Sequence, residues 1–247
     1  MKKKRLDTLL VERGCFPDGE AALRAVIAHE VKVDDVYAES ASMLVFPEAD
    51  IVVKGRKRFV SRGGYKLAAA LDAFGLDVGG MRCLDIGAST GGFTDCLLQA
   101  GAAHVVCVDV GYGQLAWTLR QDGRVEVFDR LNIRRADPER LGAPFDLIVV
   151  DVSFIGLVQL APVFAKFAAQ GTILVGLIKP QFESCPGESD HGVVNDPRVH
   201  ARVVDEVYSA LEESSFSPTG VITSPVKGAD GNTEFLIHAV FDRLSLS

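Results

Sequence analysis

The stretch Leu84-Asp-Ile-Gly-Ala-Ser-Thr-Gly-Gly92 decides the fold class of this chain. An apolar run, 81–86, leads into it, and an amphipathic segment, 93–99, follows it. This order predicts a strand that passes into a helix through a turn of small residues. Glycine permits positive φ and leaves the backbone bare, so a ligand can approach the turn closely. Because ligands of open α/β sheets bind at the carboxyl ends of strands, the turn is a candidate binding site.

The spacing of the glycines narrows the class of ligand. A dinucleotide fingerprint, G-x-G-x-x-G, needs its second glycine where this chain has Ser89. The pattern D-x-G-x-x-x-G-G after an apolar strand instead resembles the first motif of S-adenosylmethionine-dependent methyltransferases. That resemblance implies a cofactor held at the turn, with the candidate contacts Asp85, Gly87, Ala88, Ser89, Thr90, Gly91 and Gly92. A strand–helix turn that binds nothing is the alternative.

Beyond Tyr65, apolar strands alternate with helical segments. The predicted strands are Cys83–Ile86, His104–Val110, Val125–Phe128, Leu147–Asp151 and Thr172–Ile178. The predicted helices are Lys66–Phe74, Gly92–Ala100, Gly113–Gln121, Ile155–Ala169 and Arg198–Glu213. Such alternation predicts a parallel sheet with helices on both faces.

The carboxyl-terminal part breaks this alternation. The last two predicted strands, Gly220–Pro225 and Glu234–Phe241, are joined by a loop too short for a right-handed crossover, so we expect them to pair antiparallel. A mostly parallel, seven-stranded sheet with a reversed last strand is the arrangement of a class I (Rossmann-like) S-adenosylmethionine-dependent methyltransferase. The predicted fold class of this region is therefore α/β.

The first 55 residues have a different pattern, which predicts a small α+β domain. Residues 5–13 and 20–29 have helical spacing, and Asp18 is placed to cap the second helix. Alternation from Val31 onward indicates short strands. This order resembles the S-four-type RNA-binding domain, which places two helices against a phosphate backbone. Asp18-Gly19 stands where that family commonly has Ser-Arg, so one expected phosphate-contacting arginine is missing.

The charge distribution agrees with an RNA-binding amino terminus. The chain has a net charge of −7, but residues 1–65 carry 12 Lys and Arg against 10 Asp and Glu. A basic linker, 56–64, is expected between the domains 1–55 and 65–247. The candidate RNA contacts are Arg5, Arg24, Lys54, Arg56, Lys57, Arg58 and Arg62. A basic patch on an acidic protein indicates a phosphate-binding surface, and a solvated linker is the plain alternative.

Composition points to a cytoplasmic protein without a membrane anchor. The five cysteines form neither a C-x-x-C pair nor zinc-ligand spacing, which is typical of thiols in a reducing compartment. No apolar run reaches the roughly 18 residues that a membrane span needs. The basic residues at 2–5 are followed by Leu6-Asp-Thr8 rather than by the apolar stretch of a secretory peptide.

Polar residues follow several of the predicted strands. Asp109 lies about 20 residues after the glycine turn, where a carboxylate can accept hydrogen bonds from ribose hydroxyls. Residues 129–132 follow the third strand, where an adenine is expected and a solvated loop is the alternative. Asp151 and Lys179 end adjacent strands and should be neighbours, if only as a structural salt bridge. The further candidate cofactor contacts are Val110, Asp129, Leu131, Asn132 and Asp151.

Six motifs resemble those of the TlyA or haemolysin-A-like family of ribosomal RNA 2′-O-methyltransferases. They are Phe59-Val-Ser-Arg-Gly-Gly-Tyr-Lys66, Leu84–Thr94, Asp109–Trp117, Asp151-Val-Ser-Phe154, Lys179-Pro-Gln-Phe-Glu183 and Gly231-Asn-Thr-Glu234. They occur in the family's order over nearly the whole chain. The resemblance implies an FtsJ-like catalytic domain, S-adenosylmethionine as cofactor, and ribosomal RNA or ribosomal subunits as partner. It also implies a cytidine ribose as acceptor and calls for no metal.

The family's catalytic tetrad falls on Lys66, Asp151, Lys179 and Glu234. Methylation of a ribose 2′-hydroxyl removes a proton from a very weak acid while its oxygen attacks the methyl group. The resemblance implies Lys179 as the base or hydroxyl-orienting group and Asp151 as the residue that orients it. Lys66 and Glu234 would tune charge and position the ribose. In the alternative, the lysines act by stabilising developing negative charge.

Two departures from the family pattern concern domain coupling and substrate fit. Phe59 stands where the interdomain segment usually has tryptophan, and loop 184–192 is poorer in glycine.

The alternative functions are a ribosome assembly factor without methyl transfer, a haemolysin and a nucleotide-dependent oxidoreductase. The tetrad counts against the assembly factor. The lack of a membrane span or of a strongly basic amphipathic helix counts against the haemolysin, and Ser89 counts against the oxidoreductase. The target nucleotide and the oligomeric state stay open.

Overall fold

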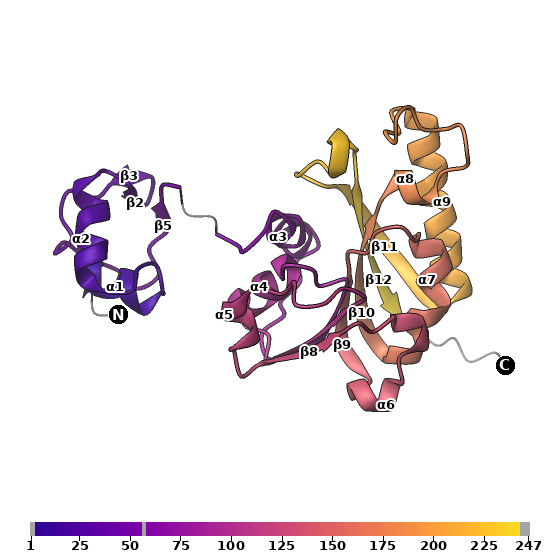
Figure 1. Ribbon diagram of the computed structural model, residues 1–247, viewed down its shortest axis with the longest axis horizontal. Coiled ribbons are helices and arrows are strands. Elements are labelled where there is room, and N and C mark those ends of the chain that lie inside the picture. The colour runs from indigo at the N-terminus through magenta and orange to yellow at the C-terminus, as the bar shows by residue number, and fades with distance from the viewer. Residues whose placement is uncertain (1–2, 56–57, 243–247) are drawn as a thin grey trace. The chain divides into compact units, whose positions relative to one another are not determined.

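The computed structural model describes residues 3–55 and 58–242 and divides the chain into two compact units, Met1–Arg58 and Phe59–Ser247 (Figure 1). The predicted linker positions Arg56 and Lys57 therefore lie outside the described residues. Each unit has its own hydrophobic core.

The amino-terminal unit packs two helices against short strands. Helices α1 (Leu6–Glu12) and α2 (Gly19–Ile27) bury Leu6, Leu10 and Val26. Asp18 caps α2 as predicted, because its carboxylate accepts a hydrogen bond from the N–H of Ala21 at 2.8 Å. The strands form two small sheets, in which β1 (Lys4–Arg5) pairs with β4 (Leu44–Val45) and β2 (Val31–Val33) lies between β3 (Val36–Tyr37) and β5 (Ile51–Val53).

A seven-stranded sheet forms the centre of the second unit, with the order β11-β12-β10-β9-β6-β7-β8. The strands are β6 (Arg82–Ile86), β7 (His104–Asp109), β8 (Val125–Asp129), β9 (Phe145–Val150), β10 (Ala168–Ile178), β11 (Phe216–Thr223) and β12 (Phe235–Phe241). Strand β12 pairs antiparallel with both of its neighbours, and the pairs among β10, β9, β6, β7 and β8 are parallel. The predicted parallel sheet with a reversed last strand is confirmed.

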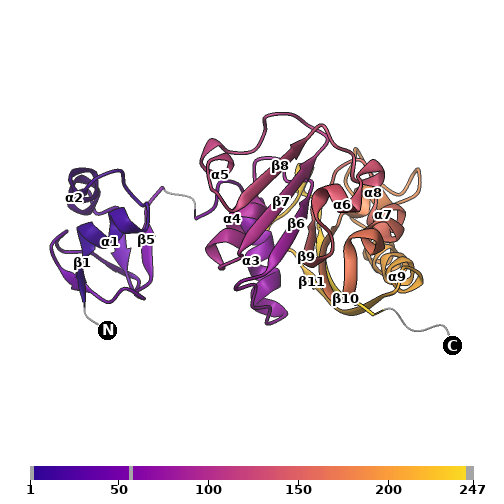
Figure 2. The same ribbon diagram turned by 90° about the horizontal axis from the view of Figure 1, so that it is seen from below.

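Helices cover both faces of the sheet (Figures 1 and 2). Helices α3 (Gly63–Ala73), α4 (Gly92–Gln99) and α5 (Trp117–Arg120) pack over one face, and α6 (Pro138–Leu141), α7 (Leu157–Phe164) and α9 (Pro197–Glu213) over the other. The short helix α8 (Pro180–Glu183) follows β10, and the 3-10 turns are Ile133–Arg135, Ala165–Phe167 and Ala229–Gly231. Residues 147–150 of the central strand β9 are all apolar, and every one of their side chains is fully buried.

Two predicted helices are shorter than expected. The helix predicted over Gly113–Gln121 begins only at Trp117. The N–H of Gly111 donates to the Asp109 carboxylate and that of Gly113 to the Asp129 carboxylate. These N–H groups therefore bond to side chains instead of forming the hydrogen bonds of a helix. The helix predicted over Ile155–Ala169 ends as α7 at Phe164, and Ala168 already pairs with β9.

Phe59 belongs to the core of the second unit, although its position was predicted to lie in a linker. Its ring is 1% exposed and meets the Tyr65 ring edge-on at 5.1 Å. Gly64 lies against this ring so closely that a Cβ there would overlap it. The N–H of Val60 also donates to the Asp95 carboxylate at 2.8 Å. Residues 59–64 therefore pack with the sheet unit, and α3 begins at Gly63, earlier than predicted.

Candidate active site

Two cavities meet at the carboxyl edge of the parallel strands. The first, called here the apolar cavity, has a volume of about 580 Å³ and lies over the ends of β6, β7 and β9. The second, called the lysine cavity, has a volume of about 330 Å³ and includes all four predicted tetrad residues. Both cavities are lined by Gly87, Ser89, Asp151 and Ser153. A group bound in one cavity can therefore reach a group bound in the other.

Gly87 brings the turn after β6 against the end of β9. Its φ is +85°, which favours glycine. A Cβ at this position would lie 2.9 Å from the carbonyl carbon of Asp151 and closer still to the carbonyl oxygen. The N–H of Gly87 donates to the carbonyl of Val108 on β7 at 2.8 Å. The absence of a side chain at Gly87 thus lets three strand ends converge at the wall that the cavities share.

The apolar cavity has hydrophobic walls and a few placed polar groups. Its walls include Ile86, Val108, Leu131, Ile133 and Ile155. The Asp109 carboxylate lies in it and accepts hydrogen bonds from the N–H groups of Ser89 (2.8 Å) and Gly111 (2.7 Å). A carboxylate has about four acceptor sites, so this one keeps capacity for ligand hydroxyls. Apolar walls beside a carboxylate that can accept hydrogen bonds from ribose hydroxyls fit the adenosine part of S-adenosylmethionine.

The predicted cofactor contacts divide into three groups. Those that line the apolar cavity are Gly87, Ser89, Asp109, Val110, Leu131, Asn132 and Asp151. Ala88, Thr90 and Gly92 line the lysine cavity instead. Asp85, Gly91 and Asp129 line neither of the two cavities.

The residues of the last group have other partners. The Asp129 carboxylate pairs with Arg120 at 2.6 Å and accepts a hydrogen bond from the N–H of Gly113. At Gly91, φ is +95° and a Cβ would overlap the side chains of Leu115 and Leu119, so the residue allows close packing between the start of α4 and the segment that contains α5.

Asp85 is fully buried and joins β6 to α4. Its Oδ2 accepts a hydrogen bond from the Thr94 hydroxyl at 2.6 Å, and its Oδ1 has no hydrogen-bond partner among the described residues. Burial raises the pKa of this carboxyl to about 7. Near neutral pH the Asp85 carboxyl at the base of the glycine turn is therefore partly protonated, whereas an ordinary aspartate is ionised.

The four tetrad residues form two ion pairs, of which Lys66–Glu234 is buried and Lys179–Asp151 is partly buried. Lys179, which follows β10, places its Nζ 2.6 Å from Oδ1 of Asp151 and 3.3 Å from the Ser153 hydroxyl. Lys66, on α3, places its Nζ 2.5 Å from Oε2 of Glu234, which precedes β12. Lys66, Lys179 and Glu234 are only 8%, 9% and 2% exposed. The predicted contact between Asp151 and Lys179 is confirmed, and each buried charge has a partner, as burial demands.

Several residues near the tetrad were not predicted individually. Ser153, Gln181 and Phe182 line the lysine cavity, and Gln181 has a buried side-chain oxygen without a hydrogen-bond partner in the described ranges. Phe154 has a φ of +68°, unusual for a bulky residue, and is 92% exposed. These residues lie inside the motifs Asp151-Val-Ser-Phe154 and Lys179-Pro-Gln-Phe-Glu183, so their closeness to tetrad residues was the available signal.

The predicted RNA contacts differ in availability. Arg5 pairs with Asp7 at 2.5 Å and Arg24 with Glu20 at 2.6 Å, both on the surface of the amino-terminal unit. Such surface pairs are weak, so a phosphate can compete for these arginines. Lys54 and Arg58 are exposed, and Arg62 is an exposed residue at the lysine cavity.

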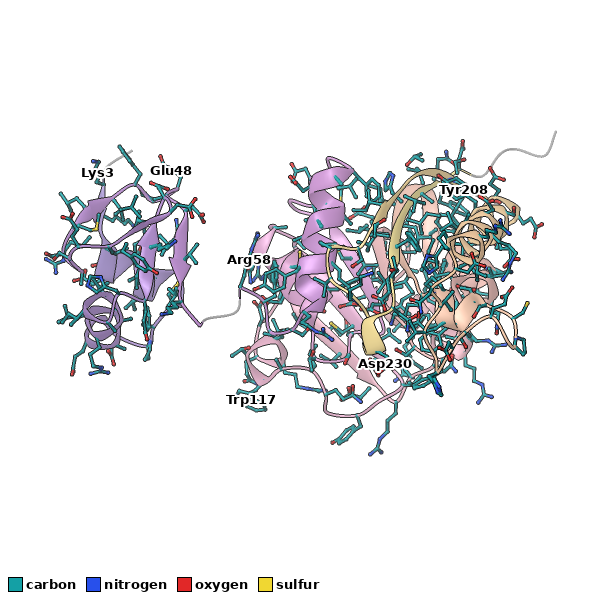
Figure 3. The ribbon with its side chains drawn as sticks, turned by 90° about the horizontal axis from the view of Figure 1, so that it is seen from above. Lys3, Glu48, Arg58, Trp117, Tyr208 and Asp230 are labelled. Carbon is teal, nitrogen blue, oxygen red and sulfur yellow. The ribbon has the colours of Figure 1, made fainter. Side chains whose placement is uncertain are left out.

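The surface of the sheet unit also bears aromatic rings. Trp117, at the start of α5, points outward (Figure 3), and Tyr112 lies exposed under the Arg130 guanidinium, 4.2 Å from its ring centre. Within residues 3–55 and 58–242, no helix is both long and apolar enough to cross a membrane.

Comparisons with known proteins agree with this geometry. The model of the FtsJ-like methyltransferase family matches residues 59–241. The 16S/23S rRNA (cytidine-2′-O)-methyltransferase TlyA of Mycobacterium tuberculosis is 43% identical over 96% of this chain and 89% of its own. Hemolysin A of Brachyspira hyodysenteriae is 36% identical over 96% of this chain and 99% of its own. These matches confirm the resemblance, the enzyme class and the methyl donor predicted from the sequence.

A solved structure shares the fold over nearly the whole chain. It comes from Streptococcus thermophilus, bears the hemolysin name and is 39% identical, with a TM-score of 0.74 over 98% of this chain and 90% of its own.

Proposed function

The chain belongs to the FtsJ-like methyltransferase family, and from this premise we propose that it methylates the 2′-hydroxyl of a cytidine in ribosomal RNA. The observation that carries the proposal is the lysine cavity, in which two Lys–carboxylate pairs adjoin the apolar cavity across a shared wall. The name of the M. tuberculosis relative, a 16S/23S rRNA (cytidine-2′-O)-methyltransferase, supports this choice of substrate.

The apolar cavity is the proposed site of S-adenosylmethionine, which supplies a methyl group on a positively charged sulfur. Asp109 would accept hydrogen bonds from the ribose hydroxyls of the cofactor, and Leu131 and Ile133 would contact its adenine. Asp151 lines both cavities and would favour positive charge at their junction. The bare backbone at Gly87 leaves room for close approach at the same place.

Lys179 is the proposed group that handles the target hydroxyl. In the reaction the 2′-oxygen would take the methyl group that S-adenosylmethionine supplies, and the hydroxyl proton would pass to water or to a neutral Lys179. Lys179 is held by Asp151 and Ser153, so its ammonium has a fixed direction and can orient the oxygen and stabilise the negative charge that develops on it. In the alternative role Lys179 would act as the base and take up the hydroxyl proton.

The remaining cavity residues suit a nucleotide. Lys66, on α3, and Glu234, just before β12, would position the acceptor ribose. The exposed ring of Phe154 offers a surface on which an unstacked base can stack, and the unpartnered oxygen of Gln181 can accept a hydrogen bond from the bound nucleotide. The amino-terminal unit is proposed to be an S-four-type RNA-binding domain that uses Arg5, Arg24 and the basic residues from Lys54 onward. The protein would act in the cytoplasm, where ribosomal subunits are assembled.

The direct experiment measures labelled methyl transfer from S-adenosylmethionine to unmodified ribosomal subunits and to naked ribosomal RNA. We expect transfer by the wild type and at least a roughly 100-fold lower rate for Lys179→Ala. Lys166→Ala, which removes an exposed lysine near β10, is the matched control and should keep the wild-type rate. Firm binding of subunits without any transfer would contradict the proposal and favour an assembly factor.

A further inference from the structure

Two active-site segments lie side by side after neighbouring strands. Loop 151–156 connects β9 to α7, and the turn 179–183 follows β10 and contains α8. At the catalytic end the two are joined by Lys179, whose Nζ contacts the side chains of Asp151 and Ser153. Further along, the rings of Phe154 and Phe182 lie 5.6 Å apart.

Glu183 joins the same segments at their far end. Its Oε1 accepts a hydrogen bond from the N–H of Leu157, the first residue of α7, and its carboxylate also accepts one from the N–H of Val158. Gly156, the residue before this helix, has no side chain that could cap it. The cap of α7 therefore comes from a residue 26 positions away in the sequence.

Gly156 allows the Glu183 carboxylate to approach the backbone. A Cβ on Gly156 would lie 2.5 Å from the carboxyl carbon of Glu183 and closer to one of its oxygens. The φ of Gly156 is −79°, which any residue can adopt. Glycine at this position is therefore explained by the space that the Glu183 carboxylate occupies, and not by the backbone conformation.

The location of Glu183 is costly for the folded state. The carboxylate is largely buried, and burial, followed by the charge of Glu206 on α9, raises its pKa to about 6. Glu183 lines neither cavity. A largely buried carboxylate that is unfavourable and lines neither cavity points to a role in holding the site in shape.

We infer that Glu183 is a positioning residue that fixes the far end of loop 151–156 and thereby holds Asp151, Ser153 and Phe154 against the turn that carries Lys179. The inference rests on the proposed function, because it concerns the geometry in which Lys179 and Asp151 meet the acceptor hydroxyl. The acceptor oxygen of Glu183, rather than its charge, performs this role.

The test compares Glu183→Ala with Glu183→Gln, which keeps an acceptor oxygen of the same reach. In methyl transfer to ribosomal subunits, we expect Glu183→Ala to lower kcat at least about 10-fold, because small displacements of reacting groups cost large factors in rate. The Kd for S-adenosylmethionine, measured by calorimetry, should rise by a smaller factor than kcat falls, because loop 151–156 also lines the apolar cavity but Glu183 itself does not. Glu183→Gln should restore kcat to within about threefold of the wild type.

A helix-cap control separates positioning from general stability. Asp137 caps α6 through the N–H of Glu139 at 3.1 Å, so Asp137→Ala removes a cap elsewhere in the unit and should leave kcat unchanged. Equal losses of kcat in Asp137→Ala and Glu183→Ala would overturn the inference.

A second variant approaches Glu183 from the other side and keeps the test valid if Glu183→Ala does not fold. Gly156→Ala adds a methyl group that displaces the carboxylate and should lower kcat as Glu183→Ala does. In the double variant Gly156→Ala/Glu183→Ala the added methyl group no longer meets a carboxylate. The double variant should therefore lose no more kcat than either single variant. Wild-type kcat in Gly156→Ala, or multiplied losses in the double variant, would refute the inference. An inactive wild type would instead overturn the proposed function itself.

Discussion

Gly87→Ala tests whether the wall between the cavities sets the rate of methyl transfer. The residue has a φ of +85°, and alanine in the left-handed region costs about 1–2 kcal/mol. The new Cβ would also overlap the carbonyl of Asp151, and the two must separate by roughly 1 Å to reach van der Waals contact. The side chain of Asp151 holds Lys179 at 2.6 Å, so the displacement reaches the tetrad directly.

The expected size of the effect follows from that displacement. A shift of about 1 Å at reacting groups can cost about 100-fold in rate, so Gly87→Ala should lower the single-turnover rate about 10- to 100-fold. Gly75→Ala is the matched control, because Gly75 has a φ of +64° with no atom within 4 Å of an added Cβ. It shares the backbone strain without the clash, so it should cost about 1–2 kcal/mol in urea denaturation and keep the rate.

The assay is single-turnover methyl transfer at saturating S-adenosylmethionine and ribosomal subunits, with stability measured on the same preparations. A wild-type rate in Gly87→Ala would refute the reasoning, because it would show that the Asp151 backbone can move without consequence. Equal losses in both variants would refute it as well, since strain alone would then explain them.

Three further predictions concern buried charges and the cofactor. Lys66→Met leaves Glu234 buried without its partner and should lower the free energy of unfolding by about 3–5 kcal/mol in urea denaturation. Adding Glu234→Leu should recover much of that stability but not methyl transfer. Recovery of methyl transfer would contradict the proposed role of the pair. Burial raises the pKa of Asp85 from an ordinary 3.8 to about 7, so the contribution of Asp85 to stability declines as the pH rises through that window. The free energy of unfolding of Asp85→Asn should therefore rise relative to that of the wild type between pH 4 and pH 8, by up to about 4 kcal/mol. A difference between the two proteins that does not change with pH would contradict this. Asp109→Ala should weaken S-adenosylmethionine binding in calorimetry about 10-fold or more while subunit binding is unchanged, and an unaltered Kd would remove Asp109 from the cofactor site.

The sequence predicted the sheet and one of the two ion pairs because both depend on local pattern and strand order. Apolar runs identified the parallel strands, and Asp151 and Lys179 end two of them, so their contact followed from topology. The contact between Lys66 and Glu234 joins residues 168 positions apart. It came from the family resemblance, since no spacing rule predicts that β12 enters the sheet between β10 and β11.

The predictions that failed have local physical causes. Residues 113–116 were assigned to a helix, but the Asp109 and Asp129 carboxylates hold the backbone around them. Phe59, between basic residues and glycines, has no hydrophobic periodicity that would reveal a buried ring. The cap that Glu183 gives to α7 is likewise invisible in sequence, because the helix and its cap come from different segments.

The measurement that tests the central claim most directly is the position of the methyl group on the RNA. Ribosomal RNA labelled by the wild-type protein would be hydrolysed with alkali, which cannot cleave next to a 2′-O-methylated ribose. We predict that the label appears in an alkali-resistant dinucleotide whose methylated nucleoside is cytidine. Label released with single nucleotides would place the methyl group on a base and would contradict the role given to Lys179 and the tetrad.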